Sequence, residues 1–104
     1  MGNEELIAEI KKTVLQVQPE AELFLYGSYA RGDQHNDSDI DILILLNQDE
    51  INKKIRDELY SLLYNLELSA NKVISPLIKA KKVWYEKYPN TGLFINISQE
   101  GFRL

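Results

Sequence analysis

The chain has 104 residues, a formal net charge of −4 at pH 7 and no cysteine. This length predicts one domain, spanning residues 1–104, with a modest hydrophobic core. The acidic balance argues against a general nucleic-acid coat protein, which would need a surplus of lysine and arginine. The lack of cysteine excludes disulfides, thiolate metal sites and cysteine nucleophiles.

The first residues, Met1-Gly2-Asn3-Glu4-Glu5, have neither the basic segment nor the apolar run of an export signal. No apolar stretch approaches the length needed to span a membrane. We therefore expect a cytoplasmic protein that has no membrane partner.

The first third of the chain predicts a helix followed by a strand. Apolar residues recur at three- and four-residue spacing across residues 4–17, which is typical of an amphipathic helix. Asn3 can cap this helix. Residues 23–26 form a short apolar run that predicts a buried strand. Residues 28–31 predict the first turn of a short helix, which Gly32 ends.

Residues 39–46 predict the central strand, because apolar side chains lie on both of its faces beyond the first few positions. One face carries Ile40, Ile42, Ile44 and Leu46, and the other carries Leu43 and Leu45. A polar loop at residues 34–38 precedes the strand. A second helix follows it, and Asn47 with Glu50 resembles a capping box at its start. The core stripe predicted for this helix is Ile51, Ile55, Leu59, Leu62, Leu63 and Leu66.

The last third predicts a further strand and two short helices. Residues 73–78 read as a strand at a sheet edge or with a bulge, because Pro76 has no N–H to donate. Residues 81–87 predict a short helix, residues 92–100 show a weak helical pattern, and residues 102–104 read as a tail. This order predicts an α/β (α+β) fold with helices packed on a mixed sheet of three or four strands.

The functional signal lies between the two apolar strands. The first strand breaks at Gly27-Ser28, and ten residues later the second begins with Asp39 and Asp41 in alternation. Alternate residues of a strand share a face, which places the two carboxylates about 7 Å apart. Gly27 has no Cβ to obstruct a phosphate, and Ser28 adds a hydroxyl and an N–H. Such a carboxylate pair facing phosphate donors suits a magnesium–nucleotide complex.

Two further residues are candidates for nucleotide or phosphate binding. Arg31 lies one turn beyond Gly27, where it can contact phosphate or pair with a loop acid such as Asp33. Ser38 is the other candidate, although its hydroxyl is well suited to tie the loop to the strand start. The site as a whole fits attack of a hydroxyl on the α-phosphate of a nucleotide, with release of pyrophosphate.

These residues resemble the signature of the DNA polymerase beta-like nucleotidyltransferase superfamily. Gly27-Ser28-Tyr29-Ala30-Arg31-Gly32 with Ser38-Asp39-Ile40-Asp41 is similar to its minimal nucleotidyltransferase branch. The resemblance implies a Mg²⁺-dependent transferase in which Asp39 and Asp41 are the catalytic metal ligands and the glycine turn holds the phosphates. It also implies a helical partner of the higher eukaryotes and prokaryotes nucleotide-binding (HEPN) family. Some minimal members are antitoxins that transfer AMP from ATP to a tyrosine of that partner.

The chain departs from the superfamily at one point. The superfamily usually places a third carboxylate on the strand after the second helix, whereas residues 71–78 contain no acid. Glu67 is the nearest candidate for a further metal ligand, and Ser75 is a candidate for the vacant place. The length also leaves no room for an acceptor domain, so the acceptor would come from a second protein or a self-associated copy.

Two functions therefore remain open. The first is transfer of a nucleoside monophosphate to a hydroxyl, with AMP from ATP and a tyrosine of a HEPN-type toxin as the favoured pair. The second is a catalytically weak or inactive module that neutralises a helical partner by docking. Transfer to a small molecule is a third option that the missing acceptor domain disfavours.

Overall fold

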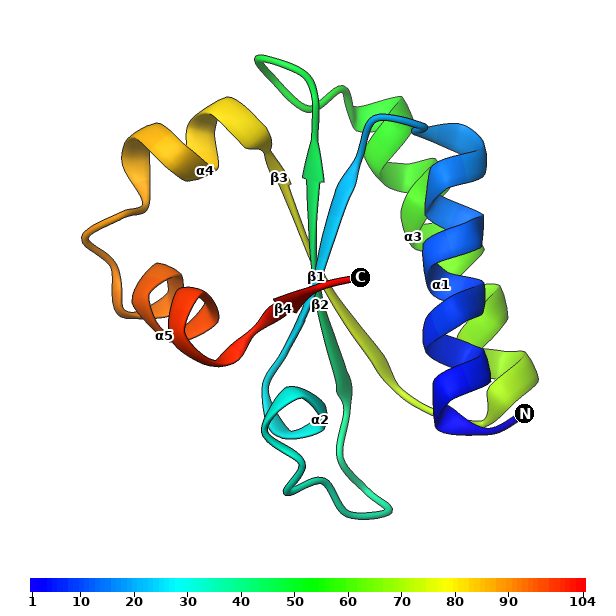
Figure 1. The fold of residues 1–104 in the computed structure, drawn as a ribbon. Coiled ribbons are helices and arrows are strands. Elements are labelled where there is room, and N and C mark those ends of the chain that lie inside the picture. Colours follow the sequence, from blue (N-terminus) through cyan, green and yellow to red (C-terminus); the bar gives the residue numbers. More distant parts are fainter.

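The helices and strands assemble around one mixed sheet, seen nearly edge-on in Figure 1 for the computed structural model of residues 1–104. The strands are β1 (Glu22–Tyr26), β2 (Ile40–Leu46), β3 (Ile74–Ala80) and β4 (Phe102–Arg103). The helices are α1 (Asn3–Val17), α2 (Ser28–Arg31), α3 (Lys53–Ala70), α4 (Lys81–Lys87) and α5 (Gly92–Glu100). The strand order is β3-β2-β1-β4. β1 runs antiparallel to both of its neighbours, and β3 runs parallel to β2. The predicted α/β (α+β) fold is confirmed, with four strands.

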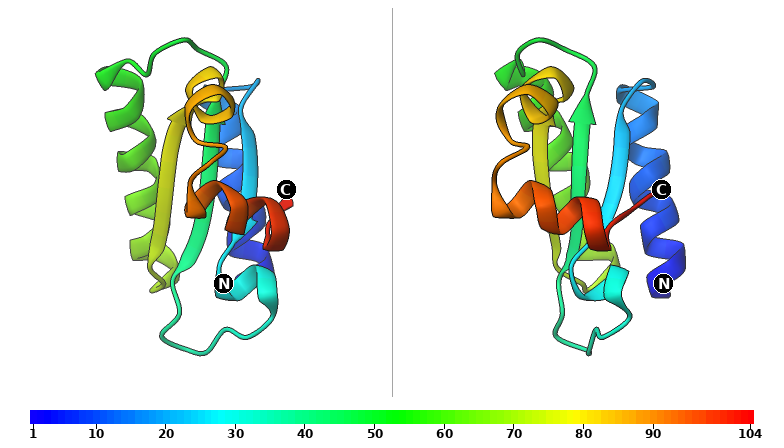
Figure 2. Two further views of the ribbon diagram at one scale, coloured as in Figure 1. Left: turned by 90° about the vertical axis from the view of Figure 1, so that its left-hand side faces the viewer. Right: turned by 60° about the vertical axis from the view of Figure 1, so that its left-hand side comes forward.

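The helices form a layer on each face of the sheet. α1 and α3 lie together on one face, and α4 and α5 cover the other (Figures 1 and 2). The single turn of α2 lies at the end of the sheet, between β1 and the loop that leads into β2 (Figure 1). None of the helices has the length and apolarity needed to cross a lipid bilayer.

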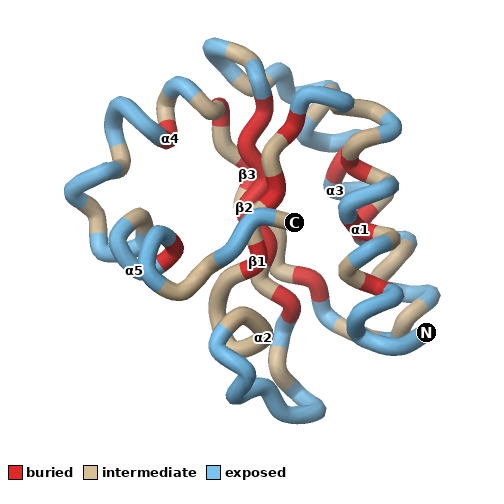
Figure 3. Tube along the Cα trace, viewed as in Figure 1, coloured by how far each residue is buried: buried red, intermediate tan, exposed pale blue.

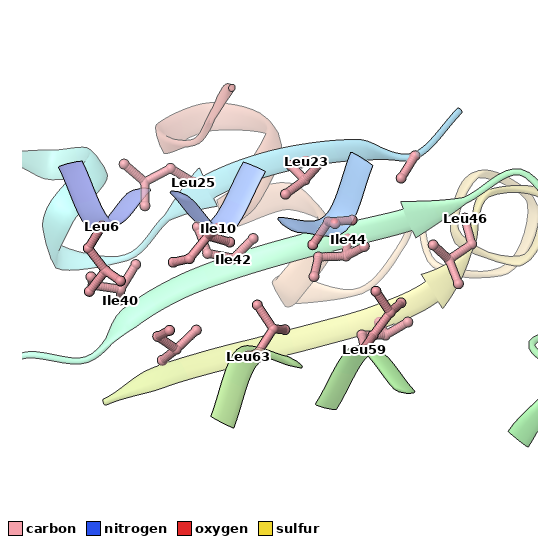
Figure 4. Close-up of a cluster of buried hydrophobic side chains, with 14 residues drawn as sticks. Leu6, Ile10, Leu23, Leu25, Ile40, Ile42, Ile44, Leu46, Leu59 and Leu63 are labelled. Carbon is pink, nitrogen blue, oxygen red and sulfur yellow. The ribbon is translucent and has the colours of Figure 1, made fainter. Parts of the chain in front are cut away.

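The core divides according to the alternation of β2, which is buried on both faces (Figure 3). The larger cluster holds 14 buried residues and lies between the sheet and helices α1 and α3. In Figure 4, Leu6 and Ile10 of α1 and Leu59 and Leu63 of α3 point at the sheet. The β2 residues in this cluster are Ile40, Ile42, Ile44 and Leu46. The smaller cluster, on the face of α4 and α5, contains Leu43, Leu45, Trp84 and Ile97. The predicted division of β2 into two apolar faces is confirmed.

Two predicted helix caps are wrong. Asn3 is the first residue of α1, and Gly2 precedes it without a side-chain cap. The cap of α3 is Asn52, whose side-chain oxygen accepts a hydrogen bond from the N–H of Lys54 at 2.7 Å. Asn47 instead donates to the Glu20 carboxylate at 2.7 Å, so it ties the end of β2 to the loop after α1. This tertiary contact overrides the local capping pattern.

The predicted tail is also wrong, because Phe102 and Arg103 form β4. Phe102 pairs with Leu25, and the N–H of Leu104 donates to the Leu23 carbonyl at 2.9 Å. A two-residue strand has too few positions to show a period in sequence, and it forms here because β1 offers an unpaired edge. At the opposite edge, Pro76 lies in β3 as predicted for an edge strand.

Leu59→Ala tests the larger core. The Leu59 side chain is 0% exposed, so its truncation should leave a cavity and lower the free energy of unfolding by about 2–5 kcal/mol. Leu68→Ala on the same helix is the matched control: Leu68 is 64% exposed and should change stability by less than about 0.5 kcal/mol. Urea unfolding of the two variants measures both effects, and equal losses would contradict the assigned face of α3.

Candidate active site

The two aspartates lie together at the start of β2. Asp41 is the second residue of the strand and is half-buried, whereas Asp39 immediately precedes the strand and is exposed. The N–H of Ile40 donates to the Val73 carbonyl at 3.0 Å, which pins the beginning of β2 to the beginning of β3. By alternation with Leu43, Asp41 faces the layer of α4 and α5.

Gly27 and Asp41 are in direct contact. Tyr26 pairs with Asp41 across the β1–β2 ladder, and the chain turns at the next residue. Gly27 has φ 74° and ψ −154°, a combination that is essentially restricted to glycine. A Cβ at this position would collide with Asp41 Oδ2 and lie 3.1 Å from its Cγ. The turn therefore needs glycine twice, once for its backbone angles and once for the carboxylate packed against its Cα.

The site carries an excess of negative charge. Burial raises the pKa of Asp41 above its ordinary 3.8, the charges of Asp39 and Glu100 raise it further, and the charge of Arg31 lowers it. Burial also raises the pKa of Tyr26, with a second contribution from Asp41. Ionised Asp41 is therefore unfavourable in the protein alone, which is the condition that a bound cation relieves.

The loop before Asp39 is closed by Ser38. Its N–H donates to the His35 carbonyl and its Oγ accepts from the His35 N–H, both at 3.0 Å. Lys72 Nζ donates to the Asn36 carbonyl at 3.0 Å and so fastens the same loop to the α3–β3 turn. The structure thus gives Ser38 the loop-tying role, and its phosphate contact stays a prediction. Lys72, which the sequence did not single out, helps to position Asp39.

Arg31 is held by two carboxylates. Its Nε donates to Asp33 Oδ2 and its Nη1 donates to Glu100 Oε1, each at 3.1 Å. Of the two roles considered for this residue, the pair with Asp33 is present, and the side chain is still 45% exposed. The contact with Glu100 spans 69 positions of sequence, and no local pattern announces it.

Glu67 does not join the aspartates. Its Oε1 accepts a hydrogen bond from the N–H of Ile74 at 2.8 Å, which closes the α3–β3 turn. α3 packs on the face of the sheet opposite to the one that Asp41 shares with Leu43. The predicted metal role of Glu67 is therefore not supported, because its carboxylate serves the main chain of β3.

Ser75 lies beside the aspartate pair. It is the partner of Asp41 in the parallel β2–β3 ladder, and partners in such a ladder point to the same face. No three histidine, cysteine, aspartate or glutamate side chains are arranged so that together they could hold a metal ion. The Ser75 hydroxyl therefore lies next to Asp41, on the strand where the resemblance led us to expect a third carboxylate.

The sequence of this chain is similar to those of known proteins. Residues 7–94 match a family model described as "Nucleotidyltransferase domain". The chain is also 32% identical over 81 residues to "Putative protein adenylyltransferase MJ0141" of Methanocaldococcus jannaschii. That alignment covers 76% of this chain and 81% of the archaeal protein.

Solved structures of toxin-antitoxin proteins have the same fold. The crystal structure of a toxin-antitoxin with AMP-PNP aligns with a TM-score of 0.63 and 24% identity, over 98% of this chain and 72% of that one. A mutant of the toxin-antitoxin MntA-HpeT aligns with a TM-score of 0.61 and 24% identity, over 100% of this chain and 72% of that one. At this level of identity the likeness concerns the fold alone.

Gly27→Ala tests the contact between the turn and the carboxylate. The substitution should lower the free energy of unfolding by about 2–4 kcal/mol, because it adds a collision with Asp41 to an unfavourable backbone conformation. Gly32→Ala is the matched control: Gly32 also has a positive φ, of 79°, but open space around it. Gly32→Ala should lower the free energy of unfolding by only about 1–2 kcal/mol. Adding Asp41→Ala to Gly27→Ala should restore part of the loss, and no restoration would contradict the assigned contact.

Asp41→Asn tests the electrostatics. Folding raises the pKa of the Asp41 carboxyl, so the folded protein binds the carboxyl proton more tightly than the unfolded chain does. The free energy of unfolding therefore falls as the pH rises from 3.8 through the raised pKa. At neutral pH the variant should be more stable than the wild type, by less than about 1 kcal/mol because water screens a half-exposed group.

This difference should shrink as the pH is lowered toward the ordinary value of 3.8, which thermal unfolding over a pH series measures. Asp37→Asn, at an exposed loop position, is the control. A variant less stable than the wild type at neutral pH would contradict the cost assigned to ionised Asp41.

Proposed function

Because this chain belongs to the nucleotidyltransferase domain family, we propose that it transfers AMP from ATP to a tyrosine hydroxyl of a helical partner protein, with Mg²⁺ as its cofactor. The predicted membership of a nucleotidyltransferase family is confirmed, and the protein is a nucleotidyltransferase. The nucleotide, the acceptor and the metal are the parts proposed here. The archaeal relative, named as a protein adenylyltransferase, supports AMP and a protein acceptor.

The observation that carries the proposal is the contact between Gly27 and Asp41. The turn after β1 and the carboxylate of β2 lie against each other without an intervening side chain. A phosphate that approaches the bare Cα of Gly27 therefore comes next to a carboxylate that needs a cation. A divalent cation held by the carboxylates would offset the repulsion between these two negative groups.

The residues present fit Mg²⁺. Asp39 and Asp41 would hold it, and their carboxylate oxygens are the hard ligands that it prefers. Mg²⁺ is commonly bound by one or two carboxylates together with substrate phosphates and water, so the lack of a third acid does not prevent binding. When bound, the ion supplies charge neutralisation at the phosphates and orients the reacting oxygens.

The transfer proposed is a direct displacement. The tyrosine oxygen forms a bond to the α-phosphorus of ATP, and the bond from that phosphorus to the bridging oxygen breaks. Pyrophosphate leaves with the electron pair, and the phenolic proton passes to water. Asp39 is exposed, so solvent reaches this end of the sheet. The chain contributes mainly positioning and charge complementarity, which dominate phosphoryl transfer.

The acceptor is proposed to come from another protein. Four of the five helices cover the two faces of the sheet and α2 lies at its end, so none of the helices within residues 1–104 forms a separate acceptor domain. The toxin-antitoxin structures with the same fold support a toxin as the partner, and we propose a HEPN-type helical protein in the cytoplasm. Self-association, with a second copy as acceptor, is the alternative source.

One observation favours a second function. Ser75 is the β3 partner of Asp41, so β3 adds no third carboxylate to the two aspartates. A module that neutralises its partner by docking, with weak or no catalysis, fits this arrangement. In that case the aspartates would have no effect on neutralisation.

A transfer assay separates the two functions. The protein is incubated with ATP labelled in the α-phosphate, Mg²⁺ and the protein encoded by the neighbouring reading frame. Asp39→Asn and Asp41→Asn should each reduce transfer of label to the neighbour by at least about 100-fold, because each removes charge stabilisation from the transition state. Asp37→Asn, in the same loop region but away from the strand, should transfer normally.

The outcomes are distinct. Label transfer that persists in the double variant of Asp39 and Asp41 would refute the assigned ligands. A wild type that transfers no label, yet neutralises the neighbour as well as its double variant does, would establish the docking module instead. Omission of Mg²⁺ should abolish transfer, and undiminished transfer in a chelator would refute the proposed cofactor.

A further inference from the structure

The guanidinium of Arg31 joins two distant parts of the chain. Asp33, which binds its Nε, is two residues away, whereas Glu100, which binds its Nη1, is the last residue of α5. Glu100 also lies beyond residues 7–94, which match the family model, so the family pattern assigns it no role. Its side chain is 27% exposed, which makes it the more enclosed of the two carboxylates.

Glu100 is anchored to the sheet beside the glycine turn. A Cβ on the next residue, Gly101, would lie 3.0 Å from the carbonyl oxygen of Leu25, so the chain here is pressed against β1. Phe102 then pairs with Leu25 in the antiparallel β1–β4 ladder. Glu100 directly precedes this contact as the last residue of α5. The carboxylate that holds Arg31 therefore starts from a fixed point beside β1, the strand that leads into Gly27.

We propose that Glu100 is a positioning residue that orients the Arg31 guanidinium for contact with the phosphates of the bound nucleotide. This inference rests on the proposed function. The carboxylates on Nε and Nη1 fix the plane of the guanidinium and leave Nη2 available to a phosphate oxygen. An arginine without these partners would lose more conformational entropy on binding. The N–H of Arg31 donates to the Gly27 carbonyl at 3.1 Å, so the arginine lies one helical turn from the glycine that contacts Asp41.

Two other roles for Glu100 make different predictions. If its negative charge mainly repelled the nucleotide, removing the charge would strengthen binding. If it accepted the proton of the attacking hydroxyl, removing the charge would lower kcat. Glu100→Gln separates these roles from positioning, because glutamine keeps an oxygen that accepts from Nη1 but carries no charge.

The experiment measures binding of AMP-PNP in Mg²⁺ by calorimetry, together with KM and kcat for AMP transfer. Glu100→Ala should raise Kd and KM about five- to tenfold, the scale of one hydrogen bond, and leave kcat within about twofold. Glu100→Gln should restore Kd and KM to within about twofold of the wild type. Gln99→Ala, at an exposed position of the same helix, is the control and should change none of them.

A double variant guards against an effect on folding. In a protein that already carries Arg31→Ala, Glu100→Ala should not weaken binding further, and a full further loss would overturn the proposal. Tighter binding in both Glu100 variants, or a lower kcat with unchanged KM in both, would also overturn it in favour of repulsion or proton transfer. A wild type that binds AMP-PNP but transfers no AMP would refute the proposed function alone, while one that binds no nucleotide would refute both.

Discussion

The burial of β2 on both faces is the constraint on which the rest of the structure depends. Ile42, Leu43 and Ile44 are each at most 1% exposed, so each face of the strand packs against one helical layer. A slip of one residue would turn Asp41 toward the larger apolar core, where an ionised carboxylate has no partner. The hydrophobic effect that drives folding therefore also selects the face on which the carboxylate pair lies.

The site is assembled from pieces whose positions follow from that strand. Pairing of β1 with β2 brings Gly27 to Asp41, and pairing of β2 with β3 brings Ser75 to the other side of the same carboxylate. The helices supply no part of this pair of contacts. A nucleotidyltransferase site can accordingly be built at the end of a small sheet. This is why a chain of 104 residues can carry the family's motif.

The features that could be predicted from the sequence are those with a local cause. The two apolar faces of β2 follow from the alternation of side chains along a strand. Gly32 ends α2 as predicted, with a φ of 79°, and Pro76 lies on an edge strand as predicted. The features that were missed have distant causes. Asn47 fits a helix cap but is engaged by Glu20 from the preceding loop, and the cap is made by Asn52. β4 exists because β1 presents a free edge, and the Arg31–Glu100 pair exists because β4 holds the end of α5 in place. Such contacts across many positions of sequence have no period and no local motif to announce them.

The electrostatics of the site explain why a partly destabilised arrangement persists in a small protein. The pKa of Asp41 is raised by its own burial and by two neighbouring carboxylates. Arg31 lowers this pKa but offsets only part of the rise, because its guanidinium is also bound by Asp33 and Glu100. Unfavourable charge at a specific point is typical of a binding site, since the free energy lost in the empty protein is recovered when a cation binds. The glycine-specific conformation of Gly27 belongs to the same arrangement, because the turn must leave its Cα bare to admit the Asp41 carboxylate. The free energy of folding lost at Asp41 and Gly27 is offset by the larger core on the opposite face of the sheet. That core contains none of the site's charged groups.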